Sequence, residues 1–241
     1  MTIKPVRSII RGATAFALAL TIGACDSEAP PAGSEPSAEP KPIGEATPVS
    51  GPQMRILAFG DSLFAGYNVG EGESYPAVLE SALRQQGIDA RVTNAGVSGD
   101  TTQAGRERLA FTLDNLEQPP DLAIVELGGN DLLRAIPPAQ IRENLAAILA
   151  ELDRRGIPVL LMGMRAPPNL GADFVGQFDA LYPALAEQYD AELVPFFLEA
   201  VYDHPQLIQP DRVHPTAEGI EALVAATVDE VVEALPEDPE S

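Results

Sequence analysis

The sequence predicts an α/β fold in which a parallel β-sheet is covered by helices on both faces. Three observations predict it. Strand-length apolar runs alternate with helix-length amphipathic runs, the strand runs are apolar almost throughout, and glycine-rich polar clusters follow several of them. With 241 residues, 45% of them hydrophobic, the chain is long enough to bury the core of such a fold.

The elements of the first half alternate in this way. Residues 55–59 form a short apolar run that ends at Gly60, which is typical of a buried strand. Residues 75–86 carry a proline at an early helical position and apolar side chains at helical spacing, and a glycine follows them, so they predict a helix. Residues 90–92 predict a second, weaker strand. Residues 122–127 predict a strong central strand.

The second half repeats the pattern. Residues 141–152 predict a long amphipathic helix that ends at the next glycine, and residues 158–164 predict another buried strand. Residues 179–189 predict a helix and residues 192–197 a short last strand. Residues 216–234 predict the closing helix. We therefore expect a single domain from residue 54 to residue 235, with a polar tail over residues 236–241.

The composition excludes several classes of partner and site. Asp and Glu number 36 against 15 Lys and Arg, a formal net charge of −21. This balance argues against a nucleic acid partner and against adhesion to anionic lipid through a polybasic patch, because both need a basic surface. One cysteine and two histidines exclude an intramolecular disulfide and a Cys-rich or His-rich metal site.

The N-terminus has the layout of a lipoprotein signal peptide over residues 1–24. Three basic residues precede the apolar segment 13–24, which is shorter than the roughly 20 residues of a membrane span. Residues 22–25, Ile-Gly-Ala-Cys, resemble the bacterial lipobox, in which cleavage precedes the cysteine and the cysteine is acylated. A plain signal peptide with an incidental cysteine is the alternative. We expect an exported bacterial lipoprotein, membrane-anchored through Cys25, with its domain in the periplasm.

A linker separates this cysteine from the domain. Residues 25–53 are rich in Pro, Ser, Ala and Glu and contain almost no large apolar side chain. Such a segment cannot bury enough surface to offset the entropy of ordering it. We interpret residues 25–53 as the lipidated cysteine followed by a disordered tether.

Ser62 is the first candidate for chemistry, because it directly follows the first predicted strand in the segment Gly-Asp-Ser-Leu. In open parallel sheets, ligands bind beyond the carboxyl ends of the strands. A serine there becomes a nucleophile when a neighbouring base takes its proton. The alternative is that Asp61 and Ser62 only cap a helix.

Two glycine-rich segments follow later strands. Gly99 lies in residues 94–101, where a glycine N–H can approach a developing oxyanion closely. Asn130 lies in residues 128–131, Gly-Gly-Asn-Asp, and its side-chain amide is a second donor of the same kind. For each segment alone, a simple turn or helix cap is the alternative.

A histidine and an aspartate precede the closing helix. Asp211 stands three residues before His214, a spacing that lets the carboxylate accept a hydrogen bond from the imidazole and fix its tautomer. A solvent-exposed loop histidine is the alternative. His204 competes for the role of base, but its neighbouring acid is adjacent in sequence, and adjacent side chains usually diverge.

Taken together and in this order, the four segments resemble the motifs of the SGNH (GDSL) hydrolase family. Longer runs after Ser62, around Asn130 and at residues 195–202 are similar to its arylesterase, thioesterase and lysophospholipase branch. The likeness extends from about residue 54 to residue 235. It implies a three-layer α/β/α, flavodoxin-like sandwich, in agreement with the alternation of elements.

The resemblance also implies a carboxylic ester hydrolase and a role for each site residue. Ser62 would be the nucleophile, His214 the base and Asp211 its orienting acid. The oxyanion would be held by the N–H groups of Ser62 and Gly99 and by the Asn130 side chain. No metal and no organic cofactor is expected.

The substrate is less closely defined by the sequence. Leu170, Phe174 and Val175 lie in the segment 165–175, where they would either line an apolar acyl groove or pack on the core. Short acyl or aryl esters and lysophospholipids suit an exported acidic protein better than anionic coenzyme A thioesters. A carbohydrate acetylesterase of the same superfamily and a non-catalytic surface lipoprotein are the alternatives.

Overall fold

Five parallel strands form one sheet in the order β2-β1-β3-β4-β5. They come from a computed structural model that describes residue 49 and residues 51–236. The strands are β1 (Met54–Gly60), β2 (Ala90–Gly96), β3 (Leu122–Glu126), β4 (Val159–Met162) and β5 (Glu192–Val194). Every residue of β3 is buried, as are the last five of β1, which explains why these strands are apolar runs without alternation.

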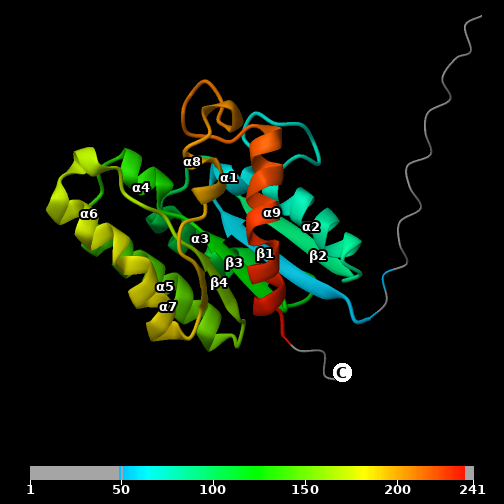
Figure 1. Cartoon of the computed structure of the whole chain (residues 1–241). Coiled ribbons are helices and arrows are strands. Elements are labelled where there is room, and N and C mark those ends of the chain that lie inside the picture. Colours follow the sequence, from blue (N-terminus) through cyan, green and yellow to red (C-terminus); the bar gives the residue numbers. More distant parts are fainter. Residues whose placement is uncertain (1–48, 50, 237–241) are drawn as a thin grey trace, which may run out of the picture. The chain divides into compact units, whose positions relative to one another are not determined.

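Long helices cover both faces of this sheet (Figure 1). The helices α2 (Tyr75–Gln85) and α9 (Ala217–Ala234) contact each other on one face. On the other face α5 (Pro138–Arg154) lies between α3 (Thr102–Asp114) and α7 (Leu181–Tyr189) and contacts both. The predicted α/β class and three-layer sandwich are confirmed.

Strand β2 is longer than predicted, and helix α3 is an additional element. Strand β2 continues from the expected end at residue 92 to Gly96, and its exposed residues include Thr93 and Asn94, because β2 lies at the sheet edge. Helix α3 is not among the elements predicted from periodicity. Its buried face includes a threonine and a glycine and only two large apolar residues, Leu109 and Leu113, so its hydrophobic pattern is weak.

Other differences concern short elements near the strand ends. Strand β5 stops at Val194 instead of residue 197, because Pro195 has no N–H for the ladder. The segment 165–175 is not an open loop, since it contains a 3₁₀ turn and the start of a helix. The additional short elements are α1 (Ser62–Ala65), α4 (Gly129–Leu133), α6 (Ala172–Asp179), α8 (Glu199–Tyr202), η1 (Pro168–Leu170) and η2 (Pro205–Leu207).

The register of the three strands β2, β1 and β3 positions the site. Gly60 is paired with Gly96 on one side and with Glu126 on the other, so the three strands end at one level of the sheet. The segments that follow them carry Ser62, Gly99 and Asn130. These residues therefore meet beyond the carboxyl ends of adjacent strands, as expected for an open parallel sheet.

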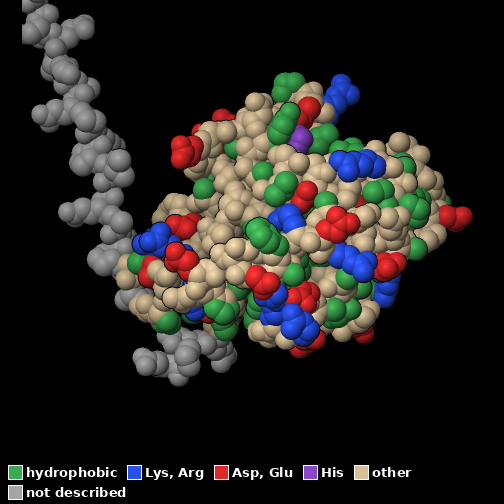
Figure 2. All heavy atoms as spheres, turned by 180° about the vertical axis from the view of Figure 1, so that it is seen from behind, with side chains coloured by type: hydrophobic (Ala, Val, Ile, Leu, Met, Phe, Trp, Pro, Cys, Tyr) green, Lys and Arg blue, Asp and Glu red, His purple; other side chains and the backbone are tan. Residues whose placement is uncertain are grey.

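The predicted signal peptide (1–24), Cys25, nearly all of the linker (25–53) and all but the first residue of the tail (236–241) lie outside the described residues. Their assignments stay predictions. Within residues 51–236, no helix combines the length and the apolar character needed to cross a membrane. Figure 2 shows one face of the molecule, on which basic side chains are interspersed with acidic ones.

Candidate active site

Three side chains form an unbroken hydrogen-bonded chain at the carboxyl edge of the sheet. The Oγ atom of Ser62, at the start of α1, lies 2.8 Å from Nε2 of His214. The other ring nitrogen of His214, Nδ1, lies 2.7 Å from Oδ2 of Asp211. His204 is exposed and its ring contacts Gln206 at 3.4 Å, so it lies outside this chain.

Asp211 is held in place by the loop that carries His214. Its Oδ1 atom accepts hydrogen bonds from the backbone N–H groups of Val213 (2.9 Å) and His214 (3.1 Å). Burial alone would raise the pKa of Asp211, but the hydrogen bonds from the His214 ring and from the two N–H groups lower it to about 2. The carboxylate therefore stays ionised above that pH and can stabilise a protonated imidazole.

Gln209 connects the histidine loop to the segment after α1, and the sequence patterns did not single it out. Its buried side chain donates to the carbonyl oxygens of Tyr67 (3.0 Å) and Pro215 (2.8 Å) and accepts from Nδ2 of Asn68 (3.1 Å). The Tyr67 ring in turn lies 4.3 Å from the ring of His214. An isolated glutamine between Ile and Pro in the sequence carries no signal for this role.

Asp61 both caps a helix and contacts the site. Its Oδ1 atom accepts from the N–H of Leu63 (3.0 Å), so the capping alternative is correct for Asp61. Its Oδ2 atom accepts from Nδ2 of Asn130 at 2.8 Å. An amide NH₂ group has two hydrogens, so this bond orients the second one. Ser62 stands in the same turn, with 8% of its surface exposed.

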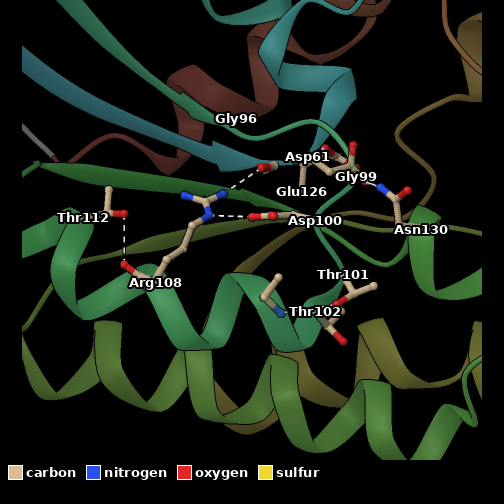
Figure 3. A network of polar contacts seen from close by, with 12 residues as sticks. Asp61, Gly96, Gly99, Asp100, Thr101, Thr102, Arg108, Thr112, Glu126 and Asn130 are labelled. Atoms are coloured by element: carbon tan, nitrogen blue, oxygen red, sulfur yellow. Dashed lines mark hydrogen bonds and ion pairs between the residues drawn. The ribbon is translucent and has the colours of Figure 1, made fainter.

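Gly99 has the backbone conformation that its neighbours in the loop require. Its φ of +88° favours glycine, and its carbonyl oxygen accepts from Nη2 of Arg134 at 2.9 Å. Thr101 caps α3 by accepting from the N–H of Ala104. The turn-and-cap alternative is thus correct for this segment, and Gly99 still lies in the cluster with Asp61 and Asn130 (Figure 3).

A shell of polar residues outside the predicted set holds these loops. Asp131 is fully buried and accepts from the N–H (2.8 Å) and the Oγ1 (2.6 Å) of Thr102, which joins α4 to the start of α3. Arg108 on α3 binds the carboxylate of Asp100 and donates to the Gly60 carbonyl at 2.9 Å (Figure 3). The members of these pairs are 29, 8 and 48 residues apart in sequence, so no local motif identifies them.

The three predicted substrate residues pack on the core. Leu170 lies in η1, and Phe174 and Val175 lie in α6, all of them half-buried. The Phe174 ring stacks on the buried Phe178 ring at 6.2 Å. Part of each side chain stays accessible at the surface. No group of three or more His, Cys, Asp or Glu within the described residues could hold a metal ion.

In comparisons with known proteins, the chain is similar to ester and thioester hydrolases. The model of the GDSL-like lipase/acylhydrolase family matches residues 58–222. The chain is 39% identical to an arylesterase of Vibrio mimicus over 181 residues, which is 75% of this chain and 90% of that protein. It is 41% identical to the thioesterase 1/protease 1/lysophospholipase L1 of Escherichia coli K12, over 66% of this chain and 74% of that protein.

A solved structure is similar over nearly its whole length. It is the crystal structure of AlinE4, an esterase of the SGNH-hydrolase family, with 66% sequence identity and a TM-score of 0.66. The match covers 78% of this chain and 99% of AlinE4. Two variants of AlinE4 have also been solved, one with a serine and one with an aspartate changed to alanine. Those two positions are as far apart in AlinE4 as Ser62 and Asp211 are here.

Proposed function

The chain belongs to the GDSL-like lipase/acylhydrolase family and is a carboxylic ester hydrolase of the SGNH type, and we propose that it acts through a Ser62-His214-Asp211 triad. The observation that carries this proposal is the hydrogen-bonded chain from Ser62 Oγ through the His214 ring to Asp211. The paired serine and aspartate variants of AlinE4 support it.

In this mechanism Ser62 Oγ attacks the carbonyl carbon of the ester while Nε2 of His214 takes the Oγ proton. The tetrahedral intermediate collapses, the bond to the alcohol oxygen breaks, and His214 returns the proton to the leaving alcohol. The acyl group then remains on Ser62. Water attacks this acyl-enzyme with His214 again as the base, which releases the acid and restores the serine. Asp211 stabilises the protonated ring in both halves.

The charge that develops on the carbonyl oxygen needs donors that are already in place. The N–H groups of Ser62 and Gly99 and the side chain of Asn130 are assigned to this oxyanion hole. The bond from Asn130 Nδ2 to Asp61 Oδ2 supports the assignment, because it leaves one amide hydrogen free and fixes its direction. Losing one such donor typically costs about 10²- to 10³-fold in turnover.

For the substrate, we propose short acyl or aryl esters or lysophospholipids. Exposed apolar surface flanks the histidine: Tyr67 is 49% exposed and contacts the His214 ring, and Val213 is 36% exposed. The accessible parts of Leu170, Phe174 and Val175 are candidates for further acyl contacts. A carbohydrate acetylesterase would instead need polar groups for sugar hydroxyls. A non-catalytic lipoprotein would have no use for the complete triad.

A panel of esters tests this substrate assignment. We expect hydrolysis of p-nitrophenyl acetate and butyrate, with kcat/KM that does not fall from acetate to butyrate, because apolar surface borders the site. Lysophosphatidylcholine should also be cleaved, as measured by release of free fatty acid. An enzyme that accepts only acetyl groups and prefers acetylated sugars over both would be the acetylesterase of the alternative.

The predicted anchor has its own test. We propose that Cys25 is acylated and ties the domain to a membrane, on the basis of the Ile-Gly-Ala-Cys segment after a basic and apolar leader. Cys25→Ser should abolish incorporation of radiolabelled palmitate in a bacterial host and alter processing of the precursor. Ser27→Ala, two residues further along, is the matched control and should be labelled like the wild type. Unchanged labelling of Cys25→Ser would refute the lipoprotein assignment.

A further inference from the structure

Glu126 is a fully buried carboxyl group next to the candidate site, and the mechanism above does not use it. It is the last residue of β3, and its side chain has no exposed surface. Its Oε2 atom accepts from the backbone N–H of Asp61 at 3.2 Å, whereas no hydrogen-bond donor among the described residues reaches its buried Oε1 atom. Figure 3 shows Glu126 directly beside Asp61.

The two carboxyl groups compete for charge in the same buried space. The backbone N–H of Asp61 donates to Glu126, and both side chains are buried, so two ionised carboxylates here would repel each other at a site that water cannot screen. A proton on one of the two removes this repulsion and turns that carboxyl group into a hydrogen-bond donor. Asp61 accepts from the Leu63 N–H and from Asn130 Nδ2, so its negative charge is compensated by two donors. Burial, and next the nearby charge of Asp61, raise the pKa of Glu126 well above its usual value.

The backbone at the end of β1 is shaped for this contact. A Cβ atom on Gly60 would lie 2.8 Å from Oε2 of Glu126 and 2.8 Å from its carbonyl oxygen, so only glycine lets the carboxyl group lie against the turn that carries Asp61. The segment Gly60-Asp61-Ser62 thus provides the space that the Glu126 carboxyl group occupies, in addition to the serine.

We propose that Glu126 is a positioning residue that stays protonated in the folded enzyme and donates a hydrogen bond to Asp61, so that ionised Asp61 holds the Asn130 amide toward the oxyanion. The inference rests on the proposed function, because it assigns Glu126 to the oxyanion-hole side chain of that site. The proton is not transferred during the reaction. It keeps one negative charge, not two, on the pair. A proton on Oε1 would also let this buried atom donate a hydrogen bond, since no donor among the described residues reaches it.

Two substitutions of Glu126 separate the effect of its hydrogen-bond donor from the effects of its charge and its size. Glu126→Gln keeps a donor of similar size, and its kcat should stay within about threefold of the wild type. Glu126→Met has similar volume but no donor, and its kcat should fall about tenfold or more with little change in KM, a part of the roughly 10²- to 10³-fold effect of a lost oxyanion donor. Thr227→Val removes the buried hydrogen bond between Thr227 of α9 and Tyr75 of α2 and controls for a mere loss of stability.

Two measurements test the protonation itself and do not depend on activity. The infrared spectrum of the wild type at neutral pH should contain a carboxylic-acid C=O band that is absent from Glu126→Gln. Thermal unfolding gives the second. Because the folded pKa is raised, the unfolded chain loses this proton first as pH rises above about 4.5, and stability of the wild type falls. The Tm of Glu126→Gln relative to wild type should therefore increase with pH.

Other titratable and charged groups face this pair from the surrounding elements, and they are the same in the wild type and in Glu126→Gln. They are Asp100, Arg108, Asp131, Tyr182 and His214. A missing infrared band, or a kcat for Glu126→Gln as low as that of a folded Glu126→Met, would overturn the proposal. If Glu126→Met does not fold, the infrared and Tm comparison with Glu126→Gln decides alone. Failure of the triad itself would appear as activity in Ser62→Ala, with the infrared band intact.

Discussion

Ser62→Ala is expected to reduce hydrolysis of p-nitrophenyl acetate and butyrate to near background. Removal of the nucleophile of a serine hydrolase triad costs on the order of 10⁴-fold or more in kcat, because the oxyanion donors and binding contacts that remain supply only part of the acceleration. The fold should survive, since the cap of α1 is made by Asp61 and not by the serine. Steady-state kinetics together with a thermal unfolding curve check both parts of this expectation.

The matched control is Ser81→Ala. Ser81 is an exposed serine on α2, where its Oγ only accepts from Gln85, so its loss should leave kcat and KM unchanged. A serine-directed phosphonate should label wild type and Ser81→Ala but not Ser62→Ala. Retention of more than a few per cent of the activity by Ser62→Ala would assign the nucleophile to another residue.

The sequence predicted the strands that are buried on both faces and the residues that follow them. Strands β1, β3 and β4 are nearly continuous apolar runs, so periodicity identifies them without any knowledge of their neighbours. Helix α3 was not predicted, because it covers the sheet with few large apolar side chains and its hydrophobic pattern is weak. The edge strand β2 is longer than predicted, because three of its seven residues are exposed and interrupt the apolar pattern.

The polar support of the site could not be predicted in the same way. Glu126 interrupts the apolar run 122–127, and only the fold shows that it ends β3 buried against Asp61. Gln209 and Asn68 are 141 residues apart in sequence and form one hydrogen bond. Motifs report residues that lie close together along the chain, whereas such contacts depend on the return of the chain to the same sheet edge.

The two histidines offer the sharpest test of the base. His214→Ala should lose on the order of 10³-fold or more in kcat, as removal of a triad base does, whereas His204→Ala should stay within about tenfold of wild type. The reason is geometric. The His214 ring joins Ser62 Oγ at 2.8 Å to Asp211 at 2.7 Å, whereas the exposed His204 ring is hydrogen-bonded to Gln206 and lies outside this chain.

Stability has to be measured alongside, because the His214 ring also packs against Tyr67 at 4.3 Å. A modest drop in the Tm of His214→Ala is expected from this lost contact, and it does not account for a 10³-fold loss if the variant is folded at the assay temperature. The phosphonate probe gives a second readout, since Ser62 without its base should be labelled far more slowly, while labelling of His204→Ala should match wild type. Equal losses in two folded variants would mean that both rings serve the reaction, and the hydrogen-bonded chain at His214 would then describe only part of the proton path.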